Sequence, residues 1–236
     1  DHYVLNGQKS FISGAGNPHD FYIVMVRTGE AGPRGISCLV VEGGTKGVYF
    51  GKNERKMGWH AQPTRAVIFE DARVPVANRL GAEGEGFRIA MAGLDGGRLN
   101  IGACSLGGGE AALEKALNYM AERKAFGRRL DQFQALQFRL ADMATELEAA
   151  RSFIWRAAAA LDAGAQDATQ LCAMAKRVAT DAGFKAANDA LQLLGGYGYL
   201  AEYGIEKIVR DLRVHQILEG TNEIMRLIVA RELVGR

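Results

Sequence analysis

The carboxylate of Glu219 lies in the run of residues 216–223, with apolar residues before it and a flexible glycine, Gly220, after it. If the apolar neighbours partly desolvate this side chain, its pKa rises and it becomes a stronger base for proton abstraction. A carboxylate at this position can equally cap the N-terminus of the last helix, where the helix dipole favours negative charge. The residue types alone leave both interpretations open.

A second candidate site is a glycine-rich turn that contains Gly195, Gly196 and Gly198 and follows an apolar stretch ending at Leu194. Glycines in such a turn can leave backbone N–H groups open toward a phosphate. The same run is typical of a helix C-cap followed by a turn. No strand pattern precedes it, so it is not a Rossmann fingerprint.

The third candidate is a basic cluster over residues 123–129, which holds Arg123, Arg128 and Arg129 and is interrupted by Phe126. An arginine here can pair bidentately with a pyrophosphate. Basic residues are also common as a solvated C-terminal cap of a helix, so this choice stays open as well. We expect no metal site, because His215 has no second ligand at metal spacing.

The composition is that of a folded chain, with 48% hydrophobic and 24% charged residues among 236, and it excludes disordered and low-complexity proteins. The formal net charge of +2 creates no field that would attract polyanions, so nucleic acid is not expected as a partner. Three widely spaced cysteines suit neither a disulfide framework nor a metal site and fit a reducing compartment. No apolar run reaches 18 residues, so we expect no membrane span.

The pattern changes near residue 80. All four prolines precede residue 76, where short apolar runs rich in β-branched and aromatic residues predict strands. These strands are expected near residues 3–5, 8–12, 21–26, 36–41 and 66–69, with a two-residue hairpin at Asn6-Gly7. We therefore expect a partial antiparallel β-barrel or sandwich over residues 1–80. The chain opens on Asp1 and enters a strand at once, as a fragment or processed product would.

Helical spacing dominates residues 81–236. Apolar residues from Phe133 to Leu161 alternate steps of three and four, which predicts a heptad seam on a helix of about 30 residues, roughly 45 Å long. Further helices are expected near residues 84–123, 168–194, 202–212 and 222–233. The fold class is therefore α+β, with an antiparallel four-helix-type bundle after the β-domain. The three glycines 107–109 predict either a break in the first helix or close packing of another backbone.

Together, in this order and spacing, the Arg-Lys-x-Phe-Gly stretch from Arg123, the Gly-Gly-x-Gly turn from Gly195 and the Glu-Gly-Thr run from Glu219 resemble the acyl-CoA dehydrogenase family of flavoenzymes. The similarity covers essentially the whole chain. It implies the second half of a middle β-domain and a complete C-terminal helical domain, without the family's N-terminal helical domain. Residues 54–79, 93–106, 141–145, 192–200 and 210–226 are most similar to members that act on a short branched acyl thioester such as isobutyryl-CoA.

By this resemblance, Glu219 is the base that takes the α-proton of the thioester while the β-hydride goes to flavin N5. The α-proton of a thioester is only weakly acidic, so its removal requires a carboxylate in a dry pocket and an oxyanion hole. The family builds this oxyanion hole from the backbone N–H that matches Glu219 and from a flavin hydroxyl. Gly220 would let the chain approach the substrate closely. Phe11, Ile12 and Ser13 match a strand that lies against the isoalloxazine ring, where the family often has Trp-Ile-Thr.

The implied cofactor is FAD, held partly by a neighbouring subunit. The residues that match its pyrophosphate and adenosine contacts are Arg123, Phe126, Gln134, Gln192, Gly195, Gly196, Thr221, Asn222 and Glu223. The residues that would contact the CoA thioester are Asp95, Gly96, Gly97, Arg98, Gly220 and Arg231. Arg98 can equally be a buried structural arginine.

The resemblance also implies an electron-transfer flavoprotein as electron acceptor and a homo-oligomer, a tetramer of two dimers. The compartment would be the bacterial cytoplasm or the mitochondrial matrix. Two alternatives stay open: a flavin-binding or nucleic-acid-associated protein of the same fold that does not dehydrogenate, and a non-catalytic helical assembly module.

Overall fold

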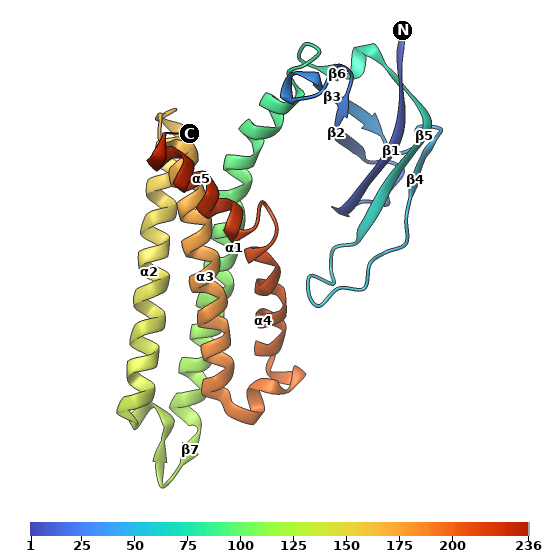
Figure 1. Cartoon of the computed structure of the whole chain (residues 1–236). Helices are drawn as coiled ribbons and strands as arrows, with labels where there is room; N and C mark the ends of the chain where they lie inside the picture. The colour runs from blue at the N-terminus through green and yellow to red at the C-terminus, as the bar shows by residue number, and fades with distance from the viewer. Residues whose placement is uncertain (236) are drawn as a thin grey trace. The chain divides into compact units, whose positions relative to one another are not determined.

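The computed structural model describes residues 1–235 and divides into two compact units. The first unit covers Asp1–Gly93 and contains the main β-strands; the second begins at Leu94 and contains the helical bundle (Figure 1). Antiparallel sheets followed by a helical bundle confirm the predicted α+β class. Among the helices of residues 1–235, none is both long enough and apolar enough to cross a bilayer.

The β-unit is built from two three-stranded sheets, both antiparallel. One has the order β1-β5-β4 and the other β2-β3-β6. The strands are β1 (His2–Ser13), β2 (Phe21–Arg27), β3 (Ile36–Glu42), β4 (Val48–Phe50), β5 (Thr64–Pro75) and β6 (Arg79–Leu80). Leu5 and Phe69 from the first sheet share one buried core with Val24 and Leu39 from the second, so the two sheets pack as a sandwich.

The predicted hairpin at Asn6-Gly7 is wrong, because β1 runs without a turn from His2 to Ser13 along β5. The Asn6 side chain donates to the Asp71 carboxylate at 3.0 Å and accepts from the Asp71 backbone N–H at 2.9 Å. Pairing slips between Leu5 and Gly7, where Gly7 has φ 135°. The asparagine and glycine therefore serve a β-bulge held by a distant strand rather than a local turn.

The bundle has the predicted helices, three long and two shorter. They are α1 (Gly86–Glu122), α2 (Gln134–Asp162), α3 (Ala168–Leu194), α4 (Ile205–Arg213) and α5 (Asn222–Val234). One buried core is formed from residues of α1, α2, α3 and α4, and α5 packs on α3 (Figure 1). The expected seam is confirmed along α2, where Met143, Leu147, Ala150, Ile154 and Ala157 are buried.

The glycines of α1 allow close packing, and the helix continues through them. A Cβ on Gly109 would lie 2.8 Å from a Leu147 methyl and 3.1 Å from the Gly183 Cα, and a Cβ on Gly183 would lie 2.4 Å from the Ser105 carbonyl oxygen. Backbones of α1 and α3 therefore meet here at a distance that only glycine permits.

A small hairpin of β7 (Lys124–Ala125) and β8 (Arg128–Arg129) connects α1 to α2. Phe126 and Gly127 form its turn with φ values of 52° and 81°. Both residues have positive φ, as a two-residue type I′ turn requires. The hairpin carries the basic cluster and lies at the opposite end of the bundle from α5 (Figure 1).

Candidate active site

Glu219 lies in the loop between the short 3₁₀ turn Val214–Gln216 and α5. Its backbone has φ 55° and is followed by Gly220 with φ 87°, so two consecutive residues occupy the left-handed region. The cap of α5 is Thr221, whose side-chain oxygen accepts from the Ile224 backbone N–H at 3.4 Å. Glu219 therefore stands outside the cap, and its half-buried carboxylate is available for another role.

The Glu219 carboxylate lies directly against Gly97 on α1. A Cβ placed on Gly97 would be 2.6 Å from Glu219 Oε2, which is shorter than any normal contact. Gly97 therefore provides the space that the carboxylate occupies. The structure thus brings together two residues that were predicted separately, one as a base and one as part of a substrate contact.

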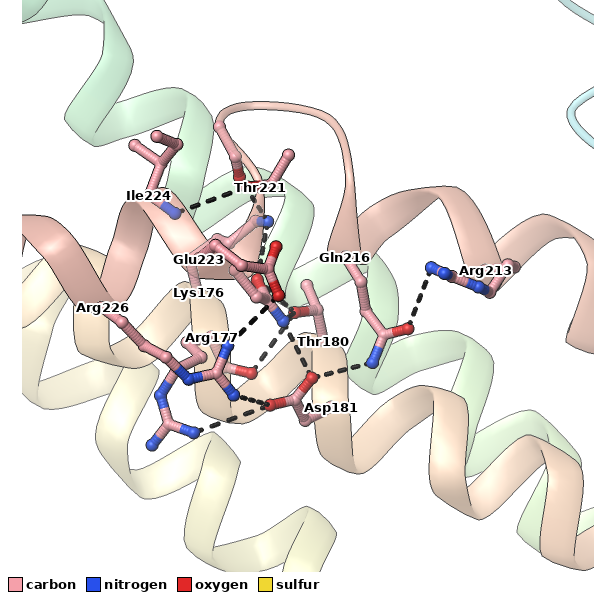
Figure 2. Close-up of polar contacts among 12 residues, drawn as sticks. Lys176, Arg177, Thr180, Asp181, Arg213, Gln216, Thr221, Glu223, Ile224 and Arg226 are labelled. Atoms are coloured by element: carbon pink, nitrogen blue, oxygen red, sulfur yellow. Dashed lines mark hydrogen bonds and ion pairs between the residues drawn. The ribbon is translucent and has the colours of Figure 1, made fainter.

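Behind the loop lies a buried polar network that is anchored on α3 (Figure 2). Lys176 Nζ donates to the Gly220 carbonyl at 2.8 Å and to Asn222 Oδ1 at 2.9 Å. Asn222 Nδ2 donates to Thr180 Oγ1 at 3.0 Å and to Asp181 Oδ1 at 2.8 Å. The side chain of Asn222, which the resemblance suggested as a cofactor contact, is 3% exposed and is engaged inside the protein.

Burial lowers the pKa of Lys176 to about 8, while the nearby carboxylates of Asp181, Glu219 and Glu223 raise it in part. Glu223 itself is exposed at the start of α5. Its pKa is lowered first by a bond from its own backbone N–H and then by the Thr221 hydroxyl. One buried cation on α3 therefore has several carboxylates around it, near the α5 end of the bundle.

Asp95 and Arg98 form a buried ion pair of 2.7 Å, and Thr169 Oγ1 donates to the other Asp95 oxygen at 2.6 Å. Both carboxylate oxygens of Asp95 thus have a partner within the bundle. Arg98 is 6% exposed, as expected of a structural arginine. Gly96 has open space where a side chain would stand, and Arg231 lies on the exposed face of α5.

A cavity of about 680 Å³ lies at the hairpin end of the bundle. It brings together four residues that were predicted to hold FAD, Arg123, Gln192, Gly195 and Gly196. Gly195 ends α3 with φ 60°, so the turn is a helix C-cap as well as a cavity wall. No atom lies within 4 Å of a Cβ position at Gly195 or Gly196, so the two glycines leave the cavity open.

Aromatic rings line the same cavity. The Arg123 guanidinium lies 5.2 Å from the centre of the Tyr197 ring, within cation–π range. Tyr119 packs against Tyr197 with 6.2 Å between ring centres. Phe126 is 96% exposed at the tip of the hairpin and Gln134 is exposed at the first position of α2, and neither lines this cavity.

The two groups of site residues lie at opposite ends of the bundle. Gly97, beside Glu219, and Tyr119, in the cavity wall, both belong to α1. At a rise of roughly 1.5 Å per residue they are about 33 Å apart along the helix. One chain therefore does not bring Glu219 and the basic cavity to the same place.

In the β-unit, the predicted flavin strand is the end of β1, Phe11–Ser13. Pairing with β5 slips between Lys9 and Ile12, and Phe11 has φ 57° within this bulge. The bulge turns the Phe11 ring outward, with 76% of the residue exposed. Ser13 is exposed as well, and Ile12 is partly buried.

Sequence reasoning missed Lys176, Arg139 and Tyr197. Arg139 lines the cavity from α2 and stands three residues after Leu136, another wall residue, so helical spacing could have linked them. Lys176 lies within a stretch of small buried residues, Ala173, Ala175 and Ala179. A lysine on a buried helical face was the available signal.

His215 and the three cysteines lie outside the two groups of predicted site residues. His215 Nδ1 and Ser105 Oγ are hydrogen-bonded at 2.6 Å between the 3₁₀ turn and α1, and burial lowers the pKa of His215 to about 4. Cys38 and Cys172 are buried thiols, whereas Cys104 is exposed. Within residues 1–235, no three His, Cys, Asp or Glu side chains form a group that could hold a metal ion.

Comparison with known families gives two matches along the chain. Residues 1–72 match the acyl-CoA dehydrogenase middle domain, and residues 84–234 match the acyl-CoA dehydrogenase C-terminal domain. The sequence is 58% identical over 234 residues to the mitochondrial isobutyryl-CoA dehydrogenase of Bos taurus, covering 99% of this chain and 56% of that protein. It is 48% identical to an acyl-CoA dehydrogenase of Bacillus subtilis, covering 99% and 61%. The chain thus spans little more than half the length of these relatives.

Solved structures give the same fold. The butyryl-CoA dehydrogenase of Megasphaera elsdenii is 43% identical with a TM-score of 0.95, and the match covers 99% of this chain and 61% of that one. A structure described as the electron transferring flavoprotein of Acidaminococcus fermentans is 46% identical with a TM-score of 0.96, covering 100% and 62%.

Proposed function

Because this chain belongs to the acyl-CoA dehydrogenase family, we propose that it serves the FAD-dependent α,β-dehydrogenation of a short branched acyl-CoA, with Glu219 as the base. The contact between the Glu219 carboxylate and Gly97 is the observation that carries this proposal. Glu219 is half-buried and is not the residue that caps α5. Its carboxylate lies beside α1, in the space left by the absence of a side chain at Gly97. The branched substrate is supported by the 58% identity to a protein named isobutyryl-CoA dehydrogenase.

The proposed chemistry begins at the α-carbon of the thioester. A Glu219 carboxylate oxygen takes the α-proton, and the electron pair of the broken C–H bond becomes the second bond between the α- and β-carbons. The β-hydrogen leaves with its electron pair as a hydride. FAD, when bound, supplies the acceptor for that hydride. The backbone N–H of Glu219 would stabilise the charge that develops on the thioester oxygen.

The cavity at the hairpin end fits the phosphate-bearing part of FAD. Arg123 and Arg139 supply guanidinium groups, which suit a pyrophosphate, and Gln192 adds a polar side chain. Gly195 and Gly196 leave the wall open for close approach. Thr221 and Glu223, at the other end of the bundle, would contact the adenosine side. In the β-unit, Phe11, Ile12 and Ser13 would lie against the ring.

The distance between the two ends supports assembly of the site from more than one copy of the chain. The base and the basic cavity are about 33 Å apart along α1, so a flavin beside Glu219 would receive its phosphate contacts from another subunit. We propose a homo-oligomer, a tetramer of two dimers. An electron-transfer flavoprotein is the proposed acceptor, supported by the names of similar proteins, among them a caffeyl-CoA reductase-Etf complex subunit of Acetobacterium woodii. The compartment would be the mitochondrial matrix or the bacterial cytoplasm.

The proposed reaction can be tested by product analysis. The purified protein, saturated with FAD and an artificial electron acceptor, is incubated with isobutyryl-CoA, and the CoA esters are weighed by mass spectrometry. We expect a product two hydrogens lighter than the substrate. Pivaloyl-CoA is the matched control, because it is branched but has no α-hydrogen for the base to take. If isobutyryl-CoA is unchanged while the bound flavin is intact, the protein binds flavin without dehydrogenating this substrate.

A further inference from the structure

Lys176 is a fully buried cation in the N-terminal half of α3, with 0% of its surface exposed. A buried ammonium group is costly unless it is hydrogen-bonded. Here its Nζ donates to two uncharged oxygens, the Gly220 carbonyl at 2.8 Å and Asn222 Oδ1 at 2.9 Å. Gly220 is the residue that follows the proposed base. Neither of these two hydrogen bonds therefore goes to a carboxylate, and one of them goes to the backbone of the loop that holds Glu219.

We propose that Lys176 is a positioning residue: it fixes the Gly220 carbonyl and thereby holds the Glu219 carboxylate against Gly97. This inference rests on the proposed function of Glu219. Lysine suits the task because its four-carbon stem reaches from the helix to the loop and its ammonium group carries three donors.

The loop needs such support because its backbone is in a conformation that side chains disfavour. Glu219 has φ 55° and Gly220 has φ 87°. A non-glycine residue in the left-handed region persists when its surroundings hold it there. The bond from Lys176 acts on the peptide unit immediately after these two residues, where it opposes relaxation of the turn.

Three further bonds connect the loop's flanks to α3 (Figure 2). Gln216 Nε2 donates to Asp181 Oδ1 at 2.8 Å before the loop, and Asn222 Nδ2 donates to the same oxygen at 2.8 Å after it. Asn222 is also oriented by Thr180, whose Oγ1 accepts from it at 3.0 Å. One face of α3, with residues 176, 180 and 181, thus holds both flanks of the loop, and Lys176 alone of these three reaches Gly220.

The charged groups around Lys176 lie in the loop and on three helices, α1, α3 and α5. Asp181 on α3, Glu219 in the loop and Glu223 on α5 favour the ammonium form, while Arg98 on α1 opposes it. With a pKa of about 8, the group is mostly protonated at pH 7. Experiments at pH 7 therefore examine the charged, three-donor form.

The test compares Lys176→Met with Lys185→Met. Methionine keeps the length of the side chain and removes the donors, and Lys185 is an exposed lysine of the same helix, paired with Glu146 at 3.1 Å. In Lys176→Met we expect amide exchange in residues 217–222 to be about tenfold faster and kcat for isobutyryl-CoA to be about tenfold to a hundredfold lower, with KM within about twofold. Lys185→Met should match the wild type in both measurements.

Hydrogen exchange measured by mass spectrometry separates positioning from general support. Exchange in α1 and in the rest of α3 should stay at the wild-type rate in Lys176→Met; a loss of protection throughout α3 would mean that Lys176 only stabilises the bundle and would overturn the proposal. Wild-type loop exchange together with wild-type kcat would overturn it too. If Lys176→Met does not fold, Thr180→Val takes its place, because it removes the hydroxyl that orients Asn222. Amide exchange of the loop must then be faster than in the wild type, and unchanged exchange counts against the proposal.

The exchange measurement needs no turnover, so it distinguishes this inference from the proposed function. If Glu219→Gln keeps full activity, Glu219 is not the base, and the proposed function fails. Faster loop exchange in Lys176→Met would then still report the contact to Gly220, whereas an unchanged loop would show that Lys176 does not hold it.

Discussion

The carboxylate of Glu219 occupies the space that the missing side chain of Gly97 leaves on α1, at a distance of 2.6 Å from where a Cβ would stand. This relationship predicts the effect of a single methyl group. In Gly97→Ala, the carboxylate must move, because no carbon and oxygen remain at that separation. We expect kcat to fall by about tenfold to a hundredfold, since a displacement of about 1 Å has effects of this size.

The protein should remain folded in Gly97→Ala, because alanine favours a helix more than glycine does. Gly107→Ala is the matched control: Gly107 is exposed on the same helix, and no atom lies within 4 Å of its Cβ position. Steady-state kinetics and thermal unfolding of both variants check this. Equal kcat in the two variants would mean that the Glu219 carboxylate does not act from its place beside Gly97.

Arg123 is expected to hold the FAD pyrophosphate. Removing one charge-assisted partner in Arg123→Ala costs roughly 1.5 to 3 kcal/mol of binding free energy, or about ten- to hundredfold in the FAD dissociation constant. Arg123→Lys should not restore the affinity, because lysine lacks the planar fork. Folding should change by less than about 0.5 kcal/mol, since Arg123 is exposed.

The FAD dissociation constant, measured by titration of the protein without bound flavin, decides the role of Arg123. Arg156→Ala is the control, because Arg156 is an exposed arginine of α2 outside the cavity. If Arg123→Ala binds FAD as tightly as this control, the basic cavity does not hold the cofactor.

Acid should destabilise the bundle through His215. Burial lowers its pKa to about 4, below the ordinary value of 6.5. Between these values the unfolded chain binds a proton that the folded chain does not, so stability falls as the pH is lowered from about 6.5 to about 4, by roughly 3 kcal/mol from this group. In His215→Gln this part of the pH dependence should disappear. Urea unfolding at several pH values checks it, and an identical pH dependence in the variant would rule out His215 as its source.

The close approach of α1 and α3 predicts a large cost for a small change. A methyl group in Gly183→Ala would lie 2.4 Å from the Ser105 carbonyl oxygen. The helices must separate, which costs about 1 to 3 kcal/mol of unfolding free energy. Gly107→Ala again serves as control, because there alanine is expected to be neutral or stabilising. Chemical denaturation of both variants measures the difference, and a Gly183→Ala protein as stable as the control would contradict the packing described.

The long helices could be predicted from the sequence because their signal is local. Spacing alone predicted a helix over residues 168–194, and α3 has those limits. Asn6-Gly7 shows the opposite case: its residue types favour a hairpin, but the partner of Asn6 is Asp71 on another strand. A contact between residues so far apart in sequence overrides the local preference, and no local pattern reports it.

Residue type and spacing made Glu219 a candidate base but left a helix cap equally open. The resemblance to a family made it the predicted base, and the structure adds that Thr221, not Glu219, caps α5. Lys176 was not identified: its place on a small-residue helical face indicates burial, but no local pattern shows that its ammonium group meets Gly220, 44 residues later. Arg139 was missed for the same reason, since only folding brings it into one cavity with Arg123 and Gln192.

If Glu219 removes the α-proton, the reduction of bound flavin by isobutyryl-CoA without air depends on the Glu219 carboxylate. Wild type and Glu219→Gln, each saturated with FAD, are mixed with substrate, and the loss of flavin absorbance is followed in a single turnover. Glutamine keeps the size of the side chain and loses its basicity, so we predict equal FAD binding and a rate at least about 10² to 10⁴-fold lower. Flavin reduction at the wild-type rate in Glu219→Gln would mean that Glu219 is not the base.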